Sequence, residues 1–260
     1  MYKKAVINLI VIFFIALISA CDTDLKKSNM NNTSNNNNSN NSFPVWETSV
    51  ITPAEVIEYA PENTSASDGP TFSDSKKALG LPLGSGINSG SLDVVSLGYD
   101  ETGVGGYIVL KFDKTIINGQ GVDFKVFENP FIKSDDSYFI EAAIIFLSED
   151  GTTWYEFPST FTGNISSIAD TQNHLNYTGY AGINPVLTNW QKEGSPKPED
   201  SDSGGDFFDL ENMTEPIKSN GFKYIKIVDT GITINDPGND SNTGTSGFDL
   251  DAVVGINYTE

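Results

Sequence analysis

The sequence contains no arginine, one cysteine and one histidine, and these shortages exclude several kinds of protein. Cys21 has no partner in the chain, so no internal disulfide is possible. All 15 basic residues are lysine, against 35 acidic residues, which gives a net charge of −20. So acidic a chain repels the phosphates of nucleic acid, and we expect no nucleic-acid partner. His174 stands in the polar run TQNHLNY with no catalytic or zinc-ligand pattern around it, so we expect a surface histidine.

The chain begins with a basic start followed by an apolar run from Ala5 to Ala20. The run is somewhat short for a membrane span, which usually needs about 20 apolar residues, and it is typical of a secretory signal. The junction ISAC resembles a bacterial lipobox, in which the cysteine becomes the lipidated first residue of the mature protein. An ordinary cleaved signal with a chance cysteine is the alternative. We therefore expect residues 1–20 to be a lipoprotein signal peptide.

Lipidation of Cys21, for instance with palmitate, would hold the protein on a membrane because each buried acyl CH₂ adds about 0.8 kcal/mol. Residues 21–42 are rich in Asn and Ser and bury too little apolar area to fold, which predicts a disordered tether. The expected location is the bacterial cell envelope, lipid-anchored at the outer membrane or cell surface.

Residues 43–260 carry the signals of one all-β domain. β-branched and aromatic runs alternate with clusters of Gly, Asn, Asp and Pro, which predicts an antiparallel β-sandwich with long loops. The Asp-Gly pair in SEDGT predicts a hairpin turn. A helical period is nearly absent, and only Pro53–Ala60 offers a short helical turn. The expected strands include Tyr107–Phe112, Asp123–Phe127, Phe139–Ser148, Thr153–Phe157 and Phe222–Asp229.

Several motifs, in order, resemble one kind of domain. LSEDGTTWYEF and FKYIKIVD resemble consecutive strands of discoidin-like domains, and LDAVVGI resembles the closing strand of galactose-binding-like jelly rolls. KKALGLPLG, SLDVVSLG, GQGVDFKVFENPF, GGDFFDL and GFDLDAV resemble a family of bacterial secreted or cell-surface proteins thought to have this fold. The resemblance covers about Thr71 to Asn257. It departs where Thr160–Asn189 and Thr230–Ser246 are long, so a site on these loops would be particular to this chain.

This resemblance implies a jelly roll with calcium near one end and a ligand site on loops. Such domains bind sugars, lipid headgroups or proteins. Fold does not determine function. We therefore expect a carbohydrate-binding surface lipoprotein with calcium-stabilised loops, and a protein-binding adhesin or interaction lipoprotein is the alternative.

The closing run GFDLDAVVGIN carries two carboxylates, Asp249 and Asp251. In one continuous strand the even residues from Phe248 to Ile256 form an apolar face, and both aspartates lie on the other face. The two aspartates either point to water or hold a cation. A cation would offset the repulsion between two like charges on one face. Calcium prefers six to eight oxygen ligands, and other motifs supply further carboxylates. The predicted metal ligands are Asp251, Asp249, Glu128, Asp123, Asp206 and Asp209.

Two glutamates fall on faces that should be buried. Glu128 shares the parity of Phe124 and Val126, and Glu141 shares that of Ala143 and following apolar residues. A buried carboxylate needs a partner, which without arginine is lysine, backbone N–H, a metal or a proton. The alternative is that both lie at strand ends and reach water or backbone amides. As a carboxylate pair they also allow a glycosidase, our third choice.

Aromatic residues in the predicted loops suggest where a sugar would bind. Flat rings stack on the apolar face of a sugar while neighbouring polar groups take its hydroxyls. The predicted ligand-binding residues are Trp190, Tyr177 and Tyr180. The alternative is that these rings pack the loops onto the sandwich.

Overall fold

The structure is a computed structural model that describes residues 48–62, 72–100, 102–231 and 247–260, all within the compact unit Ser42–Glu260. Cys21, the predicted signal peptide and the predicted tether lie outside the described residues. The strands pair antiparallel throughout this part of the chain. The expectation of an all-β antiparallel domain is therefore confirmed.

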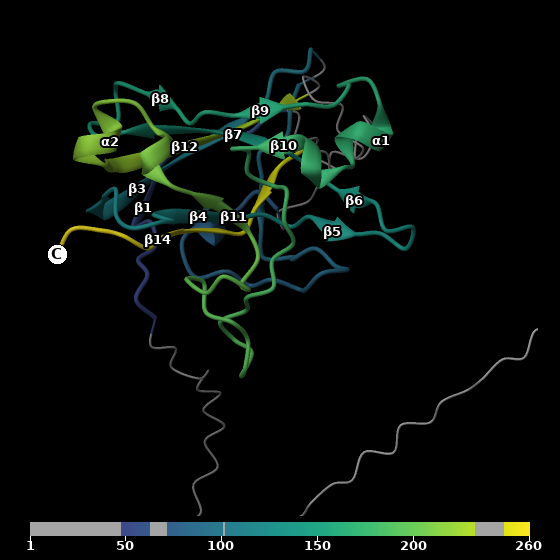
Figure 1. Ribbon diagram of the computed structural model, residues 1–260, viewed down its shortest axis with the longest axis horizontal. Coiled ribbons are helices and arrows are strands. Elements are labelled where there is room, and N and C mark those ends of the chain that lie inside the picture. Colours follow the sequence, from purple (N-terminus) through teal and green to yellow (C-terminus); the bar gives the residue numbers. More distant parts are fainter. Residues whose placement is uncertain (1–47, 63–71, 101, 232–246) are drawn as a thin grey trace, which may run out of the picture. The chain divides into compact units, whose positions relative to one another are not determined.

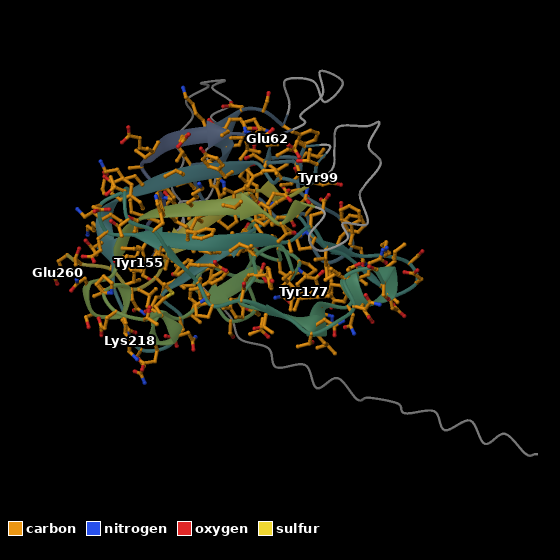
Figure 2. The ribbon with its side chains drawn as sticks, turned by 90° about the horizontal axis from the view of Figure 1, so that it is seen from above. Glu62, Tyr99, Tyr155, Tyr177, Lys218 and Glu260 are labelled. Carbon is orange, nitrogen blue, oxygen red and sulfur yellow. The ribbon has the colours of Figure 1, made fainter. Side chains whose placement is uncertain are left out.

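The larger sheet has five strands in the order β1-β3-β12-β7-β8, and Figure 2 shows its strands side by side. β12 is central, and along it Ile225 and Ile227 are fully buried while their neighbours are half-buried, as period-two alternation predicts. The predicted helical turn at Pro53–Ala60 is wrong, because that segment forms β1 and pairs with β3. The strands are β1 (Glu55–Ala60), β3 (Tyr107–Ile116), β12 (Phe222–Asp229), β7 (Ala143–Ser148) and β8 (Tyr155–Glu156).

The smaller main sheet has three strands, in the order β11 (Asp206–Phe208), β4 (Phe124–Phe127) and β14 (Ala252–Gly255). The principal hydrophobic core contains side chains from both sheets. At its centre Phe124 stacks on Phe208 with ring centroids 4.7 Å apart, and Phe222 meets Phe124 edge-on at 5.1 Å. Burial of each such side chain stabilises the fold by about 1.5–3 kcal/mol, so the domain has a sandwich-like core.

The hairpin predicted at SEDGT is present between β7 and β8. Gly151 takes φ +78°, a left-handed value that glycine adopts without steric cost. Asp150 accepts hydrogen bonds from the backbone N–H groups of Thr152 and Thr153, both at 2.8 Å, which fixes the turn.

The polar stretch Pro158–Pro216 forms only short strands and helical turns, and a second polar stretch, Thr230–Gly247, lies mostly outside the described residues. Figure 1 shows α2 and the C-terminus at one end of the domain, and α1, β5 and β6 at the other. The remaining strands are β2 (Val95–Ser96), β5 (Phe131–Ile132), β6 (Tyr138–Phe139), β9 (Thr160–Phe161), β10 (Tyr177–Thr178) and β13 (Asp249–Leu250). The helical turns are η1 (Ser75–Ala78), α1 (Ile168–Thr171), η2 (His174–Asn176), η3 (Leu210–Asn212) and α2 (Ile217–Asn220).

Candidate functional site

The closing run is two strands and not one, which changes the position of both aspartates. β13 pairs with β2, whereas β14 pairs with β4, and the chain changes partner at Asp251. As a result Leu250 and Val253, three residues apart, both enter the principal core. The predicted continuous apolar face is therefore wrong, because period-two alternation holds only while a strand keeps one sheet.

Asp251 is buried, with 2% of its surface exposed. Its two carboxylate oxygens both accept the backbone N–H of Leu83, at 3.1 and 3.0 Å. Burial raises the pKa of Asp251 well above its usual range, the nearby Asp93 carboxylate adds to the rise, and the Leu83 N–H opposes it. Asp251 thus joins the closing strand to a loop, and it does not point to water.

Asp206, at the start of β11, has a similar role. It accepts hydrogen bonds from the backbone N–H groups of Gly182 at 2.7 Å and Ile183 at 3.0 Å, and from the side-chain amide of Asn184 at 2.8 Å. Gly182 has φ +86°, and a Cβ there would lie 2.1 Å from the carbonyl oxygen of Glu141, so only glycine fits. Burial raises the pKa of Asp206 to about 7, against these hydrogen bonds, which lower it. Both of its oxygens are engaged by the fold.

Asp123 and Asp209 are also occupied locally. Asp123, which is fully buried, accepts the backbone N–H groups of Gly119 and Leu210, both at 2.7 Å, and the side-chain amide of Asn257 at 2.8 Å. Asp209 caps η3 by accepting the backbone N–H of Glu211 at 2.8 Å. These contacts give the carboxylates of Asp123 and Asp209 partners within the fold.

Glu128 and Asp249 are the two predicted ligands that come together. Glu128 is 1% exposed, and its Oε1 accepts the backbone N–H of Asp249 at 3.0 Å. The Asp249 carboxylate accepts the hydroxyl of Ser96 and, at 3.4 Å, the side-chain amide of Asn129. Burial raises the pKa of Glu128 well above its usual range, and the charge of Asp249 adds to the rise. The predicted burial of Glu128 is confirmed.

A predicted ligand can bind calcium only with a carboxylate oxygen that the fold does not already use. Within the described ranges, no group of three or more Asp, Glu, His or Cys side chains is arranged to hold a metal. Asp123, Asp206 and Asp251 direct their oxygens to amides of the fold, so the six predicted ligands do not form one site. The exception is the Oε2 atom of Glu128, which is buried and has no hydrogen-bond partner among the described residues. This atom, beside Asp249, fits one cation, and no other predicted ligand offers such an atom.

Trp190 lines a cleft of about 410 Å³. The backbone N–H of Trp190 donates to the carbonyl of Pro82 at 3.2 Å, and the preceding Asn189 forms a bridge with Leu83, the residue that Asp251 holds. The buried carboxylate of Asp251 therefore positions Leu83, which lines the cleft and pairs with the residue before Trp190. Its other lining side chains include Gln191, Leu81, Asp74, Asp93, Lys76 and Lys77.

Tyr177 and Tyr180 lie elsewhere and do not line this cleft. Their rings meet edge-on with centroids 5.7 Å apart, and both pack on a small cluster formed by Ile140, Ala142 and Ile183. The hydroxyl of Tyr177 donates to the carbonyl of Thr171 at 2.8 Å. Figure 2 places Tyr177 far along the domain from Tyr155. These two rings hold their loop against the domain, as the alternative interpretation describes.

Neither glutamate of the predicted pair lines the Trp190 cleft or the two clefts beside Phe207 and Phe131. Glu141 is 3% exposed, as its parity predicts, and accepts the backbone N–H of Gly247 at 2.9 Å. Sequence reasoning missed Asp229, which ends β12 and accepts the N–H groups of Gly231 and Phe248, both at 2.6 Å. The sequence signal that could have identified Asp229 is its position as the last residue of the strand-forming run FKYIKIVD.

Sequence reasoning also missed Lys125, which is 2% exposed in β4. Its ammonium donates to the carbonyl of Asp200 at 2.6 Å and to the Ser203 hydroxyl at 2.8 Å, under the ring of Phe207. Burial lowers the pKa of Lys125 to about 8, although nearby carboxylates oppose this. Lys125 holds the acidic loop that precedes β11.

A second cleft, of about 230 Å³, lies over that loop. Three of its apolar lining residues are unusually exposed: Ile87 by 48%, Leu187 by 39% and Phe207 by 49%. Exposed apolar side chains that gather around one cleft are typical of protein contact surfaces.

The helices among the described residues are all too short to cross a membrane. Comparisons with protein-family models, curated proteins and solved structures found no match to this chain.

Proposed function

We propose that the domain is a ligand-binding module, that its ligand is a carbohydrate held in the Trp190 cleft, and that a lipid on Cys21 anchors it at the bacterial cell envelope. The observation that carries the proposal is the composition of this one cleft. An aromatic ring, an amide and charged side chains of both signs line it together. Sugars present both apolar C–H faces and hydroxyls, so they need this mixture.

The polar groups of the cleft suit hydroxyls that both donate and accept hydrogen bonds. Lys77 donates to the carbonyl of Leu92 at 2.8 Å and lies 3.4 Å from the Asp93 carboxylate, so both are held in place. Asp74 is fixed by accepting the backbone N–H of Lys76 at 3.1 Å. Side chains that are held before binding lose less conformational freedom on binding, which favours affinity.

The experiment is a glycan array followed by calorimetric titration of the best glycan, with the full-length protein in detergent. Trp190→Ala should weaken binding at least tenfold, since loss of a stacked ring removes about 1.5 kcal/mol or more. Trp154→Ala is the matched control, because Trp154 is also half-buried but lies in the β7–β8 turn, away from the cleft. Equal affinities of the two variants would overturn the assignment of this cleft.

A protein partner is the second candidate, and the exposed apolar cleft of Ile87, Leu187 and Phe207 supports it. If the domain is an adhesin or interaction lipoprotein, no glycan will bind, and Phe207→Asp will abolish capture of a defined protein that Trp190→Ala leaves intact. Catalysis is the third choice. It would fall if Glu128→Gln and Glu141→Gln match wild type on every glycoside hydrolysed.

We also propose that the sandwich has jelly-roll connectivity. The five-stranded and three-stranded sheets around one core together have the eight strands typical of that fold. Lipidation is tested separately by the mass of the mature N-terminus, and Cys21→Ser should release the protein from the membrane fraction.

A further inference from the structure

One carboxylate oxygen in this domain lacks the partner that its burial requires. The Oε2 atom of Glu128 is buried and makes no hydrogen bond to any described residue, while Oε1 accepts the N–H of Asp249 at 3.0 Å. Nearly all buried polar atoms in proteins are hydrogen-bonded, so this oxygen needs an explanation, and a bound ion is one. Four buried aspartates, Asp123, Asp206, Asp229 and Asp251, accept hydrogen bonds on both carboxylate oxygens, whereas Glu128 accepts on only one.

The charges around Glu128 make a buried, ionised carboxylate there still less favourable. The three ion pairs between described residues do not include Glu128. The charged groups that act on it most are the carboxylates of Asp249 and Asp206, which are both negative. A buried charge beside like charges is unfavourable unless a positive species lies among them.

The groups beside the two carboxylates include the hydroxyl oxygen of Ser96 and the backbone carbonyl of Ser91. Ser96 donates its hydroxyl to Asp249, and Asn129 joins Asp249 at 3.4 Å to the carbonyl of Ser91 at 3.2 Å. Neither sulfur nor imidazole is among these groups. A set of carboxylate, hydroxyl and carbonyl oxygens suits the hard cations, above all calcium and magnesium.

We propose that Glu128 and Asp249 bind one divalent cation, of which calcium fits the donors best. Two carboxylates balance its charge, and the Ser96 hydroxyl, backbone carbonyls and water complete a flexible shell that magnesium tolerates less readily. The cation ties the end of β4 to β13 and, through Ser96, to β2. The sugar cleft does not enter this proposal, so either can fail alone.

The test is the thermal melt of the full-length protein in detergent, at pH 7.5 and 0.15 M salt, in EDTA and then in excess calcium or magnesium. Calcium a hundredfold above its Kd should raise the midpoint by about 5 °C or more. Glu128→Gln should abolish this rise. In EDTA, Glu128→Gln should melt no lower than wild type, because the neutral amide removes a buried charge. A missing response of this variant to calcium therefore cannot be explained by misfolding.

Glu193→Gln is the matched control, since it makes the same charge change at an exposed residue and should keep the full response to calcium. An equal rise in wild type and Glu128→Gln would assign calcium to the acidic surface and overturn the proposal. Melts of wild type that coincide with and without cations, together with a loss of stability on raising pH that Glu128→Gln removes, would show that a proton occupies this place. That outcome also overturns it. Calorimetric titration should give one strong site in wild type and none in Glu128→Gln.

Discussion

Replacing Asp206 by asparagine and by alanine separates the charge of this residue from its hydrogen bonds. Asparagine keeps one carboxamide oxygen for the backbone N–H groups of Gly182 and Ile183, and it removes the buried charge. Alanine removes both. The third donor, Asn184, is exposed and can turn its amide to water, so its loss should cost little.

The magnitude follows from the two buried donors. Gly182 and Ile183 are both buried, and each N–H left without an acceptor costs about 1–3 kcal/mol. Asp206→Ala should therefore be less stable than Asp206→Asn by about 2–6 kcal/mol. For a domain of this size, a mid-range difference of about 4 kcal/mol lowers the Tm by about 8–16 °C.

The assay is urea unfolding and a thermal melt of all variants in EDTA, so that no divalent cation contributes. Asp209 provides the control in the same motif, because its capping bond goes to an exposed N–H and the difference between Asp209→Ala and Asp209→Asn should be about 1 kcal/mol. If the two Asp206 variants unfold at the same urea concentration, the carboxylate does not hold the Gly182 loop and the reasoning is refuted.

Two further predictions concern the other buried carboxylates and pH. Asp251→Ala should destabilise by about 1–3 kcal/mol and weaken glycan binding in the Trp190 cleft, because the Leu83 N–H loses its acceptor, whereas Asp251→Asn should retain both properties. Because burial raises the pKa of Asp206 from 3.8 to about 7, protonation stabilises the folded state, and this contribution is present below about pH 4 and lost as pH rises to 7. In EDTA, the urea midpoint should fall as pH rises from about 4.5 to 7.5, with at most about 4 kcal/mol from Asp206, and Asp206→Asn should flatten the curve. A midpoint that rises over this range in wild type would contradict the prediction.

Local patterns in the sequence were enough to locate many strands. The run FKYIKIVD forms β12 with the predicted bounds, and the Asp-Gly turn joins β7 to β8. Parity along single strands also placed Glu128 and Glu141 inside. These predictions succeed because alternation and turn chemistry depend on residues within a few positions of one another.

The sequence did not indicate where the chain passes from one sheet to another. The run from Phe248 to Ile256 alternates without interruption, yet the chain leaves β2 and joins β4 at Asp251. Likewise, Trp190 and Tyr177 stand in loops of similar composition, but only Trp190 reaches the cleft whose opposite wall comes from residues about 100 positions earlier. Which loop aromatic lines a cleft depends on what lies across from it.

The sequence by itself determined an acidic, all-β chain with buried carboxylates and no arginine to pair with them. Only the tertiary structure decided what each carboxylate does, because the partners are far away in the chain. The Leu83 N–H that Asp251 accepts is 168 residues away, and the Asp249 N–H that Glu128 accepts is 121 residues away. A backbone amide is present at every position, so composition cannot indicate which one a folded chain will bring to a given oxygen. The free oxygen of Glu128 became visible only after the other carboxylates had their partners.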